Sequence, residues 1–415
     1  MEQLSWDECE CSVKKAFEGR ECKLLGYDVR PASDTQIGFL GVHLRIEARV
    51  LLDGSREEAV RLFAKKPPTS EAHGSFVAVC SFFRREAKAY TSYAPRLKQV
   101  LLPAGPRLPM TECYFARGED VRGDVIVMQD LRLAGYEMAD KRTPMDLLRT
   151  KAVLWALARL HGASVLMQRN SELYRKGEFE SIEEAVFMDD PNHPSYKWSL
   201  SSAETFASAV VRIWPERFPD RAKVFEASWN AWKEIFKVVR HSDVYLNVLC
   251  HGDTWANNIM FRENGDGLEA ILVDFQQHRY APPALDIVNL LHTTTRREFR
   301  DENLEGLLAF YREAFSRVVS PELADQILTM DQLRKCTDEV RVYGRCFSTS
   351  LLPLVLLSDS KDGSAAPQEE KPDFIEDMVR DRADDVLRSI AQDDDAKERI
   401  MECYQEFLES AGLWE

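Results

Sequence analysis

The sequence predicts an α+β protein with two lobes, a small β-rich one followed by a larger, mainly helical one. The chain has 415 residues, which is ample for two packed lobes with substantial cores. Up to about residue 130 the apolar runs are mostly short and β-like, whereas from residue 143 to about 245 apolar residues recur mainly at helical spacing. We therefore expect an N-terminal lobe of residues 1–130 and a C-terminal lobe of residues 131–415.

The N-terminal lobe is predicted to begin with an amphipathic helix over residues 4–18 and a strand over residues 24–29. The next segment, residues 37–47 (IGFLGVHLRIE), places Gly38 and Gly41 between two β-like runs. Glycines at such a turn let backbone amides approach phosphates. An ordinary hairpin explains the two glycines equally well.

The following strand, residues 61–65 (RLFAK), ends in a lysine. A lysine on such a strand can reach the α- and β-phosphates of a nucleotide if a carboxylate holds it in place. Glu86 offers that carboxylate from a predicted helix 21 residues later. Lys66 competes with Lys65, but Lys65 alternates onto the same strand face as Phe63. An exposed lysine and a helix-surface glutamate are the alternative interpretation of the pair.

Residues 125–131 (VIVMQDL) read as a buried strand that leads into a polar break. Residues 143–163 form a predicted helix, which Thr143 and Pro144 begin and Gly162 follows after the last turn. Residues 165 to about 245 are mainly helical and contain four tryptophans. Tryptophans at helical spacing are more often core residues than ligand contacts.

The most informative segment contains Asp253, Asn258 five residues later, and Asp274 after an apolar strand. Residues 259–261 and 270–273 read as two strands joined by an Asn-Gly-Asp-Gly turn. A hairpin therefore carries Asn258 at one base and Asp274 at the other.

These residue types and this order suit phosphoryl transfer. Chemistry on a γ-phosphate needs a carboxylate near the attacking hydroxyl, oxygen ligands for Mg²⁺ from two directions, and a rigid frame between them. Asp253 or Asn258 alone is also explained as a loop cap bonded to its own backbone. Asn257 competes with Asn258 for the metal, and only the five-residue spacing favours Asn258.

The same segment resembles the catalytic region of the aminoglycoside phosphotransferase and choline kinase group, and most closely that of the ecdysteroid kinase-like family found in insects. The family run H-G-D-x-W-x-N-N-I-M-F stands at residues 251–261, and V-D-F-Q stands at residues 273–276. The resemblance implies a bilobal protein-kinase-like fold. It also implies that Asp253 is the catalytic base and that Asn258 and Asp274 hold Mg²⁺.

Softer matches extend the resemblance over most of the chain. The family has L-F-A-K at Lys65, and some members have a similar Gly-rich turn near Gly38 and Gly41, although the broader G-x-N-Y-x-S form is absent. The strand over residues 125–131 is similar to the family linker, where adenine meets backbone groups. The residues that would then border adenine are Met128, Gln129, Asp130 and Leu131.

The implied function is that of an ATP- and Mg²⁺-dependent kinase acting on a hydroxyl of a small organic acceptor. Ecdysteroids are what the family name implies, and a detoxifying kinase for xenobiotics would look the same. One alternative is a choline- or aminoglycoside-type kinase, which the acidic balance permits. Another is a nucleotide- or ligand-binding protein of this fold that has lost catalysis. Asp253, Asn258 and Asp274 are all retained, which favours an enzyme.

Composition bounds the partners and the compartment. The formal net charge is −15 with a pI near 5.2, and no long Lys/Arg run offsets it, so we expect neither nucleic acid nor anionic membranes as partners. The nine cysteines show no Cys-x-x-Cys metal pattern, which suits reduced thiols. The N-terminus lacks a signal-peptide core, and no stretch approaches the ~20 apolar residues of a membrane span. We expect a cytoplasmic protein of undetermined oligomeric state.

Overall fold

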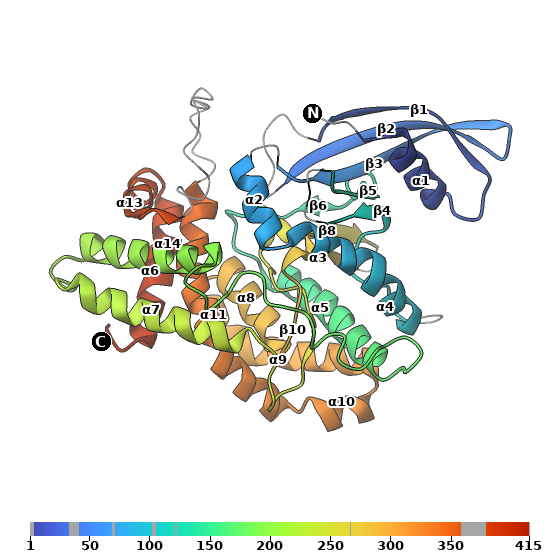
Figure 1. The fold of residues 1–415 in the computed structure, drawn as a ribbon. Helices are drawn as coiled ribbons and strands as arrows, with labels where there is room; N and C mark the ends of the chain where they lie inside the picture. Colours follow the sequence, from blue (N-terminus) through green and yellow to red (C-terminus); the bar gives the residue numbers. More distant parts are fainter. Residues whose placement is uncertain are drawn as a thin grey trace.

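The smaller lobe is built on an antiparallel sheet of five strands in the order β1-β2-β3-β5-β4 (Figure 1). The computed structural model describes residues 4–32, 41–68, 71–101, 105–119, 121, 123–265, 267–357 and 379–414. The strands of this sheet are β1 (Cys22–Pro31), β2 (Val42–Leu52), β3 (Arg56–Lys66), β4 (Cys113–Arg117) and β5 (Val125–Gln129).

Local sequence explains the long β2–β3 hairpin at the centre of this sheet. Alternate residues of β2 from Leu44 to Leu52 are buried, as expected when one sheet face packs on a core. Asp53 and Gly54 both take positive φ between the two strands, a conformation that Gly and Asp tolerate best. Helix α1 (Trp6–Ala16) begins at a capping box of Ser5 and Glu8 and packs on this sheet.

A run of helical turns connects the sheet to the larger lobe. It comprises α2 (Glu71–Val79), α3 (Phe82–Lys88), the π-helical turn η1 (Ala89–Tyr93) and α4 (Ala94–Leu101). Helix α4 packs on α5 (Leu147–Gln168) of the larger lobe. This run therefore carries side chains of α3 toward the junction of the two lobes.

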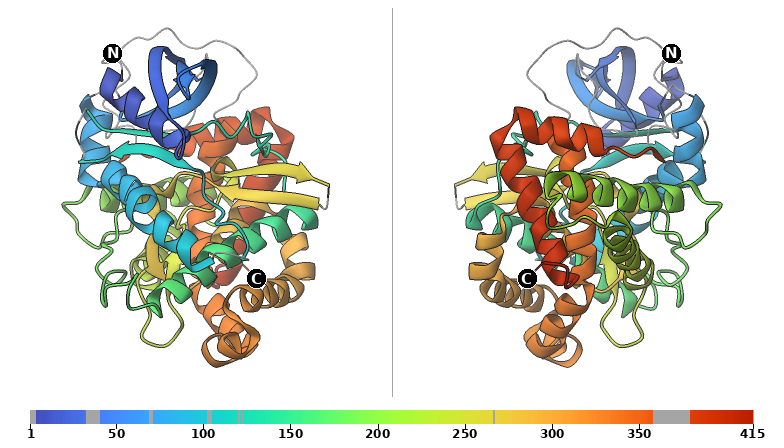
Figure 2. Two further views of the ribbon diagram at one scale, coloured as in Figure 1. Left: turned by 90° about the vertical axis from the view of Figure 1, so that its right-hand side faces the viewer. Right: turned by 90° about the vertical axis from the view of Figure 1, so that its left-hand side faces the viewer.

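The larger lobe is mainly helical, and both side views place the smaller lobe's sheet above it (Figure 2). Helix α5 packs against α9, and α8 packs against α11. Besides α5, its helices are α6 (Pro194–Ile213), α7 (Arg221–Val238), α8 (Ala284–Thr294), α9 (Arg297–Val319), α10 (Pro321–Ile327), α11 (Met330–Leu357), α13 (Ala383–Gln392) and α14 (Asp394–Ser410).

Two small sheets of the larger lobe frame the predicted catalytic segment. One has the order β6-β8-β9, and the other pairs β10 with β7. Their strands are β6 (Glu137–Met138), β7 (Val248–Cys250), β8 (Ile259–Asn264), β9 (Gly267–Leu272) and β10 (Arg279–Ala281), with 3₁₀ turns η2 (Ala256–Asn258) and η3 (Phe275–Gln277). The predicted hairpin is thus formed by β8 and β9.

The predicted limits of the helix over residues 143–163 are wrong at both ends. Helix α5 begins after Asp146, whose side chain accepts a hydrogen bond from the Arg149 amide, and it continues to Gln168. Gly162 lies inside the helix, where a Cβ would come within 2.5 Å of Val318 Cγ1 on α9. This glycine therefore permits close helix packing and does not end the helix.

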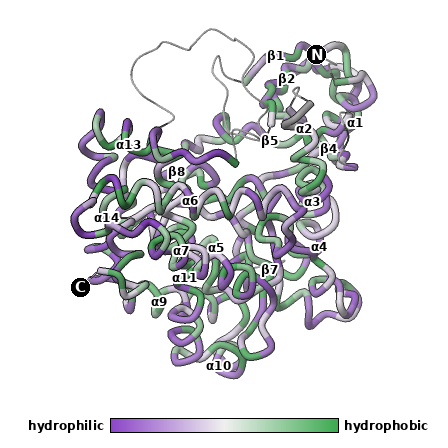
Figure 3. Tube along the Cα trace, turned by 60° about the vertical axis from the view of Figure 1, so that its left-hand side comes forward, coloured by the Kyte–Doolittle hydropathy of each residue, from purple (hydrophilic) through white to green (hydrophobic). Residues whose placement is uncertain are grey.

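The α+β class and the division into a β-rich lobe and a helical lobe are confirmed. The boundary between residues 130 and 131 stays a prediction. Figure 3 shows hydrophobic and hydrophilic stretches alternating along the helices. Within the described parts of the chain, no helix has an apolar stretch long enough to cross a bilayer.

Candidate active site

A cavity of about 550 Å³ lies where the two lobes meet. The smaller lobe contributes residues of β2, β3, α3 and β5 to its lining, and the larger lobe contributes the catalytic segment, α6 and α11. Gly38 lies outside the described residues. All other predicted site residues line this cavity, namely Gly41, Lys65, Glu86, Met128, Gln129, Asp130, Leu131, Asp253, Asn258 and Asp274.

Lys65 connects the two lobes through a pair of carboxylates. Its Nζ donates to Glu86 Oε2 at 2.7 Å and to Asp274 Oδ1 at 2.9 Å. Burial opposes the charge on Lys65, but the two carboxylates raise its pKa above the ordinary value. Gln276 stands in the V-D-F-Q run but had no predicted role, and its Oε1 lies 3.5 Å from the same nitrogen.

Asp253 and Asn258 face each other after β7. The Asn258 amide nitrogen donates to the backbone oxygen of Asp253 at 2.9 Å and to its Oδ2 at 2.8 Å. Asp253 is only 6% exposed, and this burial, together with the nearby Asp274, raises its pKa to about 7. The Val273 amide donates to the Asn258 backbone oxygen at 3.0 Å, which ties this pair to the residue before Asp274.

Asp286 at the start of α8 braces the loop before Asp253. It accepts the amides of His251 at 2.7 Å and Gly252 at 2.8 Å, and His161 Nε2 lies 3.1 Å from the same carboxylate. These are the backbone contacts expected of a bracing residue. Although burial opposes its charge, His161 and the backbone amides keep the pKa of Asp286 below its ordinary value.

His251 takes a structural position between Asp253 and the hairpin. Its Nδ1 accepts the Asp253 amide at 3.2 Å, so the proton belongs on Nε2, which lies 2.9 Å from the Val273 oxygen. Burial lowers the pKa of His251. A neutral ring with both nitrogens engaged holds the loop in place and is not available as a base.

Asp274 has an unusual backbone conformation. It takes φ 66° and ψ 68°, a left-handed conformation that is rare for residues other than glycine. This turn between β9 and η3 brings its carboxylate to Lys65, and 29% of the side chain stays exposed. Of the two carboxylates that contact Lys65, the more exposed one is therefore that of Asp274, a predicted metal ligand.

Asn258 and Asp274 fit the requirements of a Mg²⁺ site. Mg²⁺ prefers oxygen ligands and is usually bound by one or two carboxylates together with substrate phosphates and water. Both residues line the cavity. Because the Asn258 amide nitrogen is engaged by Asp253, its amide oxygen is left available as a ligand.

An apolar wall forms part of the cavity lining. We define this acceptor wall as Val186, Trp198, Phe347, Leu351 and Leu354. Val186 and Trp198 lie within residues 165–245, and the other three members come from α11. The periodicity of apolar residues predicts an apolar face on α11 but does not tell whether that face packs on the core or lines a cavity.

The two lobes, the lysine–glutamate pair and the Asp-x4-Asn set with its following Asp together define a protein-kinase-like fold. The sequence matches the ecdysteroid kinase-like family over residues 37–320, and the chain belongs to that family. Membership supports a small-molecule kinase of the choline and aminoglycoside phosphotransferase type. A comparison with curated proteins found no match.

Solved structures that are similar to this chain include the following three. The ethanolamine kinase of Plasmodium vivax has 12% identity and a TM-score of 0.41, with 93% of this chain and 83% of that chain covered. The GDP and kanamycin complex of APH(2")-IIia has 12% identity and a TM-score of 0.37, with 93% and 99% covered. A microcompartment-associated aminopropanol kinase has 11% identity and a TM-score of 0.42, with 94% of each chain covered.

Proposed function

We propose that this protein transfers the γ-phosphate of ATP to a hydroxyl of a small apolar alcohol, an ecdysteroid or a xenobiotic. The observation that carries the proposal is the convergence of Lys65, Asp253 and Asp274 on one cavity. Each residue offers one of the functions that phosphoryl transfer requires. Hormone inactivation and detoxification both fit this reaction, and ATP as donor suits the cytoplasm.

Asp253 is the proposed base. Its Oδ2 accepts a hydrogen bond from Asn258, which holds the carboxylate in place to orient and deprotonate the acceptor hydroxyl. A pKa raised to about 7 by burial suits a general base near neutral pH.

Lys65 is the proposed anchor for the α- and β-phosphates, with Glu86 fixing its direction. Mg²⁺ bound by Asn258 and Asp274 would neutralise charge on the β- and γ-phosphates. Gly41 leaves room for the lysine, because a Cβ there would lie 3.2 Å from Lys65 Cε. The proposed adenine site is bordered by Met128, Gln129, Asp130 and Leu131.

The lining of the cavity favours an apolar acceptor over a cationic one. Among the described lining residues, the carboxylates are Glu86, Asp130, Asp253 and Asp274, all of which already have proposed places near the nucleotide or the reacting hydroxyl. The acceptor wall is hydrocarbon and aromatic, and Arg382 adds a cation nearby. An aminoglycoside carries several ammonium groups and would need further carboxylates to offset its charge.

The test is ATP consumption by the purified protein with Mg²⁺ across ecdysteroids, phenolic glycosides, choline and aminoglycosides, with the mass of each acceptor measured. We expect phosphorylation of a steroid or phenolic alcohol, and Asp253→Asn should lower turnover about a thousandfold, or roughly 4 kcal/mol of transition-state stabilisation. Asp243→Asn changes an exposed aspartate and should retain wild-type turnover.

Two outcomes would contradict the proposal. Wild-type turnover in Asp253→Asn would remove Asp253 from the reaction. Binding of ATP with no acceptor of the panel modified would instead favour a ligand-binding protein of this fold.

A further inference from the structure

Arg279 lies buried directly behind the catalytic loop. On β10 it pairs with Cys250 of β7, three residues before Asp253. Gly252 lies against it, since a Cβ on Gly252 would come within 3.2 Å of Arg279 Nε. The Arg279 side chain is only 3% exposed and is not among the residues that line the cavity. Arg279 can therefore act on the reaction in two ways, by its charge, which opposes the rise in the pKa of Asp253, and through the residues that it contacts.

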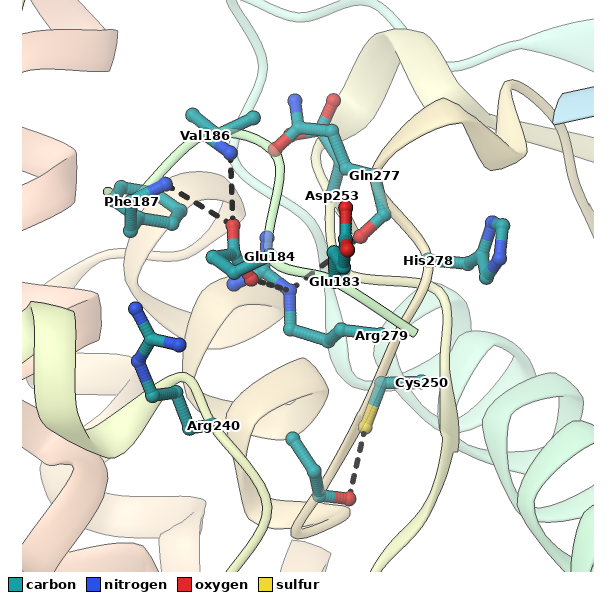
Figure 4. Close-up of polar contacts among 12 residues, drawn as sticks. Glu183, Glu184, Val186, Phe187, Arg240, Cys250, Asp253, Gln277, His278 and Arg279 are labelled. Carbon is teal, nitrogen blue, oxygen red and sulfur yellow. Dashed lines mark hydrogen bonds and ion pairs between the residues drawn. The ribbon is translucent and has the colours of Figure 1, made fainter. Parts of the chain in front are cut away.

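The charged partner of Arg279 comes from the segment that carries part of the acceptor wall. Arg279 Nε lies 3.4 Å from Glu184 Oε2, and the Glu184 side chain is 4% exposed (Figure 4). Glu184 Oε1 accepts the amides of Val186 at 3.0 Å and Phe187 at 3.1 Å. Burial opposes the charge of Glu184, yet Arg279 and these amides keep its pKa below the ordinary value. One carboxylate thus fixes the Val186 backbone and contacts Arg279.

Phe187 provides a second link from Arg279 to the wall. The guanidinium carbon of Arg279 lies 5.2 Å from the centre of the Phe187 ring. The same ring packs against Trp198 and Phe347, with ring centres 6.4 Å and 5.8 Å apart. Through Phe187, Arg279 is therefore linked to Trp198 on α6 and Phe347 on α11. Through Glu184 it is linked to the Val186 backbone.

The position of this guanidinium depends on few contacts. Within the described residues, its Nη1 and Nη2 have no hydrogen-bond partner, so its restraints are the charge of Glu184, the Phe187 ring and a long hydrogen bond of 3.4 Å from Nε to the Gln277 backbone oxygen. A second arginine, the half-buried Arg85 of α3, ties the same two segments through the backbone oxygens of Glu183 at 2.5 Å and Gln276 at 3.0 Å. Arg85 holds backbone, whereas Arg279 contacts the side chains of Glu184 and Phe187, which adjoin the wall.

We infer that Arg279 is a positioning residue that, through Glu184 and Phe187, sets the acceptor wall against Asp253. This inference deepens the proposed transfer reaction and rests on it. The acceptor hydroxyl must meet the carboxylate within a narrow range of geometry, and a displacement of about 1 Å can lower the rate about a hundredfold. The buried pair would keep the wall within that range.

The variant that separates this role from simple loop capping is Glu184→Gln. Glutamine keeps an oxygen for the Val186 and Phe187 amides but removes the charge that faces Arg279. Arg279→Lys is a second variant, because it keeps the positive charge and removes the planar guanidinium. The matched control is Glu178→Gln, which removes the charge of the Glu178–Arg96 pair. Glu178 lies between α5 and α6, as Glu184 does, and neither Glu178 nor Arg96 lines the cavity.

The first readout is hydrogen exchange of the full chain with Mg²⁺ and the ATP analogue AMP-PNP. We expect Glu184→Gln and Arg279→Lys to raise exchange about tenfold or more in residues 184–188 and also in residues 250–258. Glu178→Gln should raise it in neither. Faster exchange confined to residues 184–188, or no change, would overturn the inference.

The second readout is kinetic and uses the acceptor that the wild type phosphorylates best, with 20-hydroxyecdysone tried first. Both variants should lower kcat/KM for the acceptor about tenfold or more while the KM for ATP stays within about twofold. If kcat/KM falls equally for the acceptor and for ATP, and in proportion to the fall in melting temperature, the pair has a merely structural role. That result would overturn the inference. Failure of the wild type on every acceptor would contradict the proposed function instead, and the exchange result would then decide the inference alone.

Discussion

Lys65 is the residue at which the charges of the two lobes meet. Glu86 approaches it from α3 and Asp274 from the larger lobe, and the lysine side chain is only 5% exposed. Removing one partner of a buried ion pair leaves the other charge without compensation. In this cluster the loss of the lysine would leave two carboxylates facing each other.

Lys65→Met should therefore affect both stability and catalysis. We expect the free energy of unfolding in urea to fall by about 3 kcal/mol and kcat/KM for ATP to fall about a hundredfold or more. Lys66→Met is the neighbouring control, and its kinetics should stay within about twofold of the wild type. An equal kinetic loss in the two variants would show that Lys65 is not the specific anchor.

At the scale of elements, the turn from β7 into the catalytic loop depends on Gly252. Its φ is 85°, and a Cβ there would lie 2.1 Å from the Gln277 backbone oxygen. Gly177 has nearly the same φ, 86°, with no atom within 4 Å of such a Cβ. An alanine at Gly177 would meet backbone strain alone, whereas an alanine at Gly252 would meet the same strain and a steric overlap.

Gly177→Ala should lower the free energy of unfolding by about 1 kcal/mol, since alanine pays only the penalty of the left-handed conformation. Gly252→Ala should lower it by about 3 kcal/mol or more and reduce turnover, because the overlap is with backbone two residues before β10. Urea denaturation of both variants measures the difference. Equal losses would mean that the loop relaxes without difficulty and that its packing is not tight.

Helix α14 is attached to the lobe by a row of glutamates. Glu402 contacts Arg296 at 2.9 Å and Glu409 contacts Arg297 at 2.7 Å. Glu406 is the most buried of the row, with 11% of its side chain exposed, and it pairs with Arg300 and faces Arg345 at 3.5 Å. Only Glu406 holds two arginines in a largely dry environment.

Glu406→Ala should thus lower the free energy of unfolding by about 3 kcal/mol, since Arg300 and Arg345 would be left without their shared anion. Glu398→Ala on the same helix removes a pair whose glutamate is 67% exposed and should change stability by no more than about 1 kcal/mol. Thermal or urea unfolding of the two variants gives the comparison. A loss in Glu398→Ala as large as in Glu406→Ala would rule out burial as the cause.

At the scale of the whole molecule, the cavity lies between the lobes, so a ligand bound there stabilises both together. AMP-PNP with Mg²⁺ at a hundred times its Kd should add about 2.7 kcal/mol to the free energy of unfolding. Chelating Mg²⁺ should weaken this effect in the wild type, and Asp274→Ala should make the remaining effect insensitive to the metal. Equal stabilisation of the wild type with and without Mg²⁺ would argue against the proposed metal ligands.

The sequence predicts those parts of the site whose residues are close in sequence and have a recognisable spacing. The spacing of Asp253 and Asn258 fits their contact, and a strand-to-helix separation anticipated the pairing of Lys65 with Glu86. The Arg279–Glu184 pair has no such signal, because its members are far apart in sequence and meet only after the helices pack. Gly162 misleads for the same reason, since its close neighbour lies on another helix.

The division of the cavity between different elements has a consequence for how such a chain can diversify. Lys65, Asp253 and Asp274 are fixed by strands, turns and buried hydrogen bonds, whereas Leu351 and Leu354 line the cavity from α11 alone. On the proposed assignment, substitutions of these leucines exchange one alcohol for another and leave the handling of ATP intact. A gene copy could therefore acquire a new substrate through a few conservative changes in α11, without passing through an inactive intermediate.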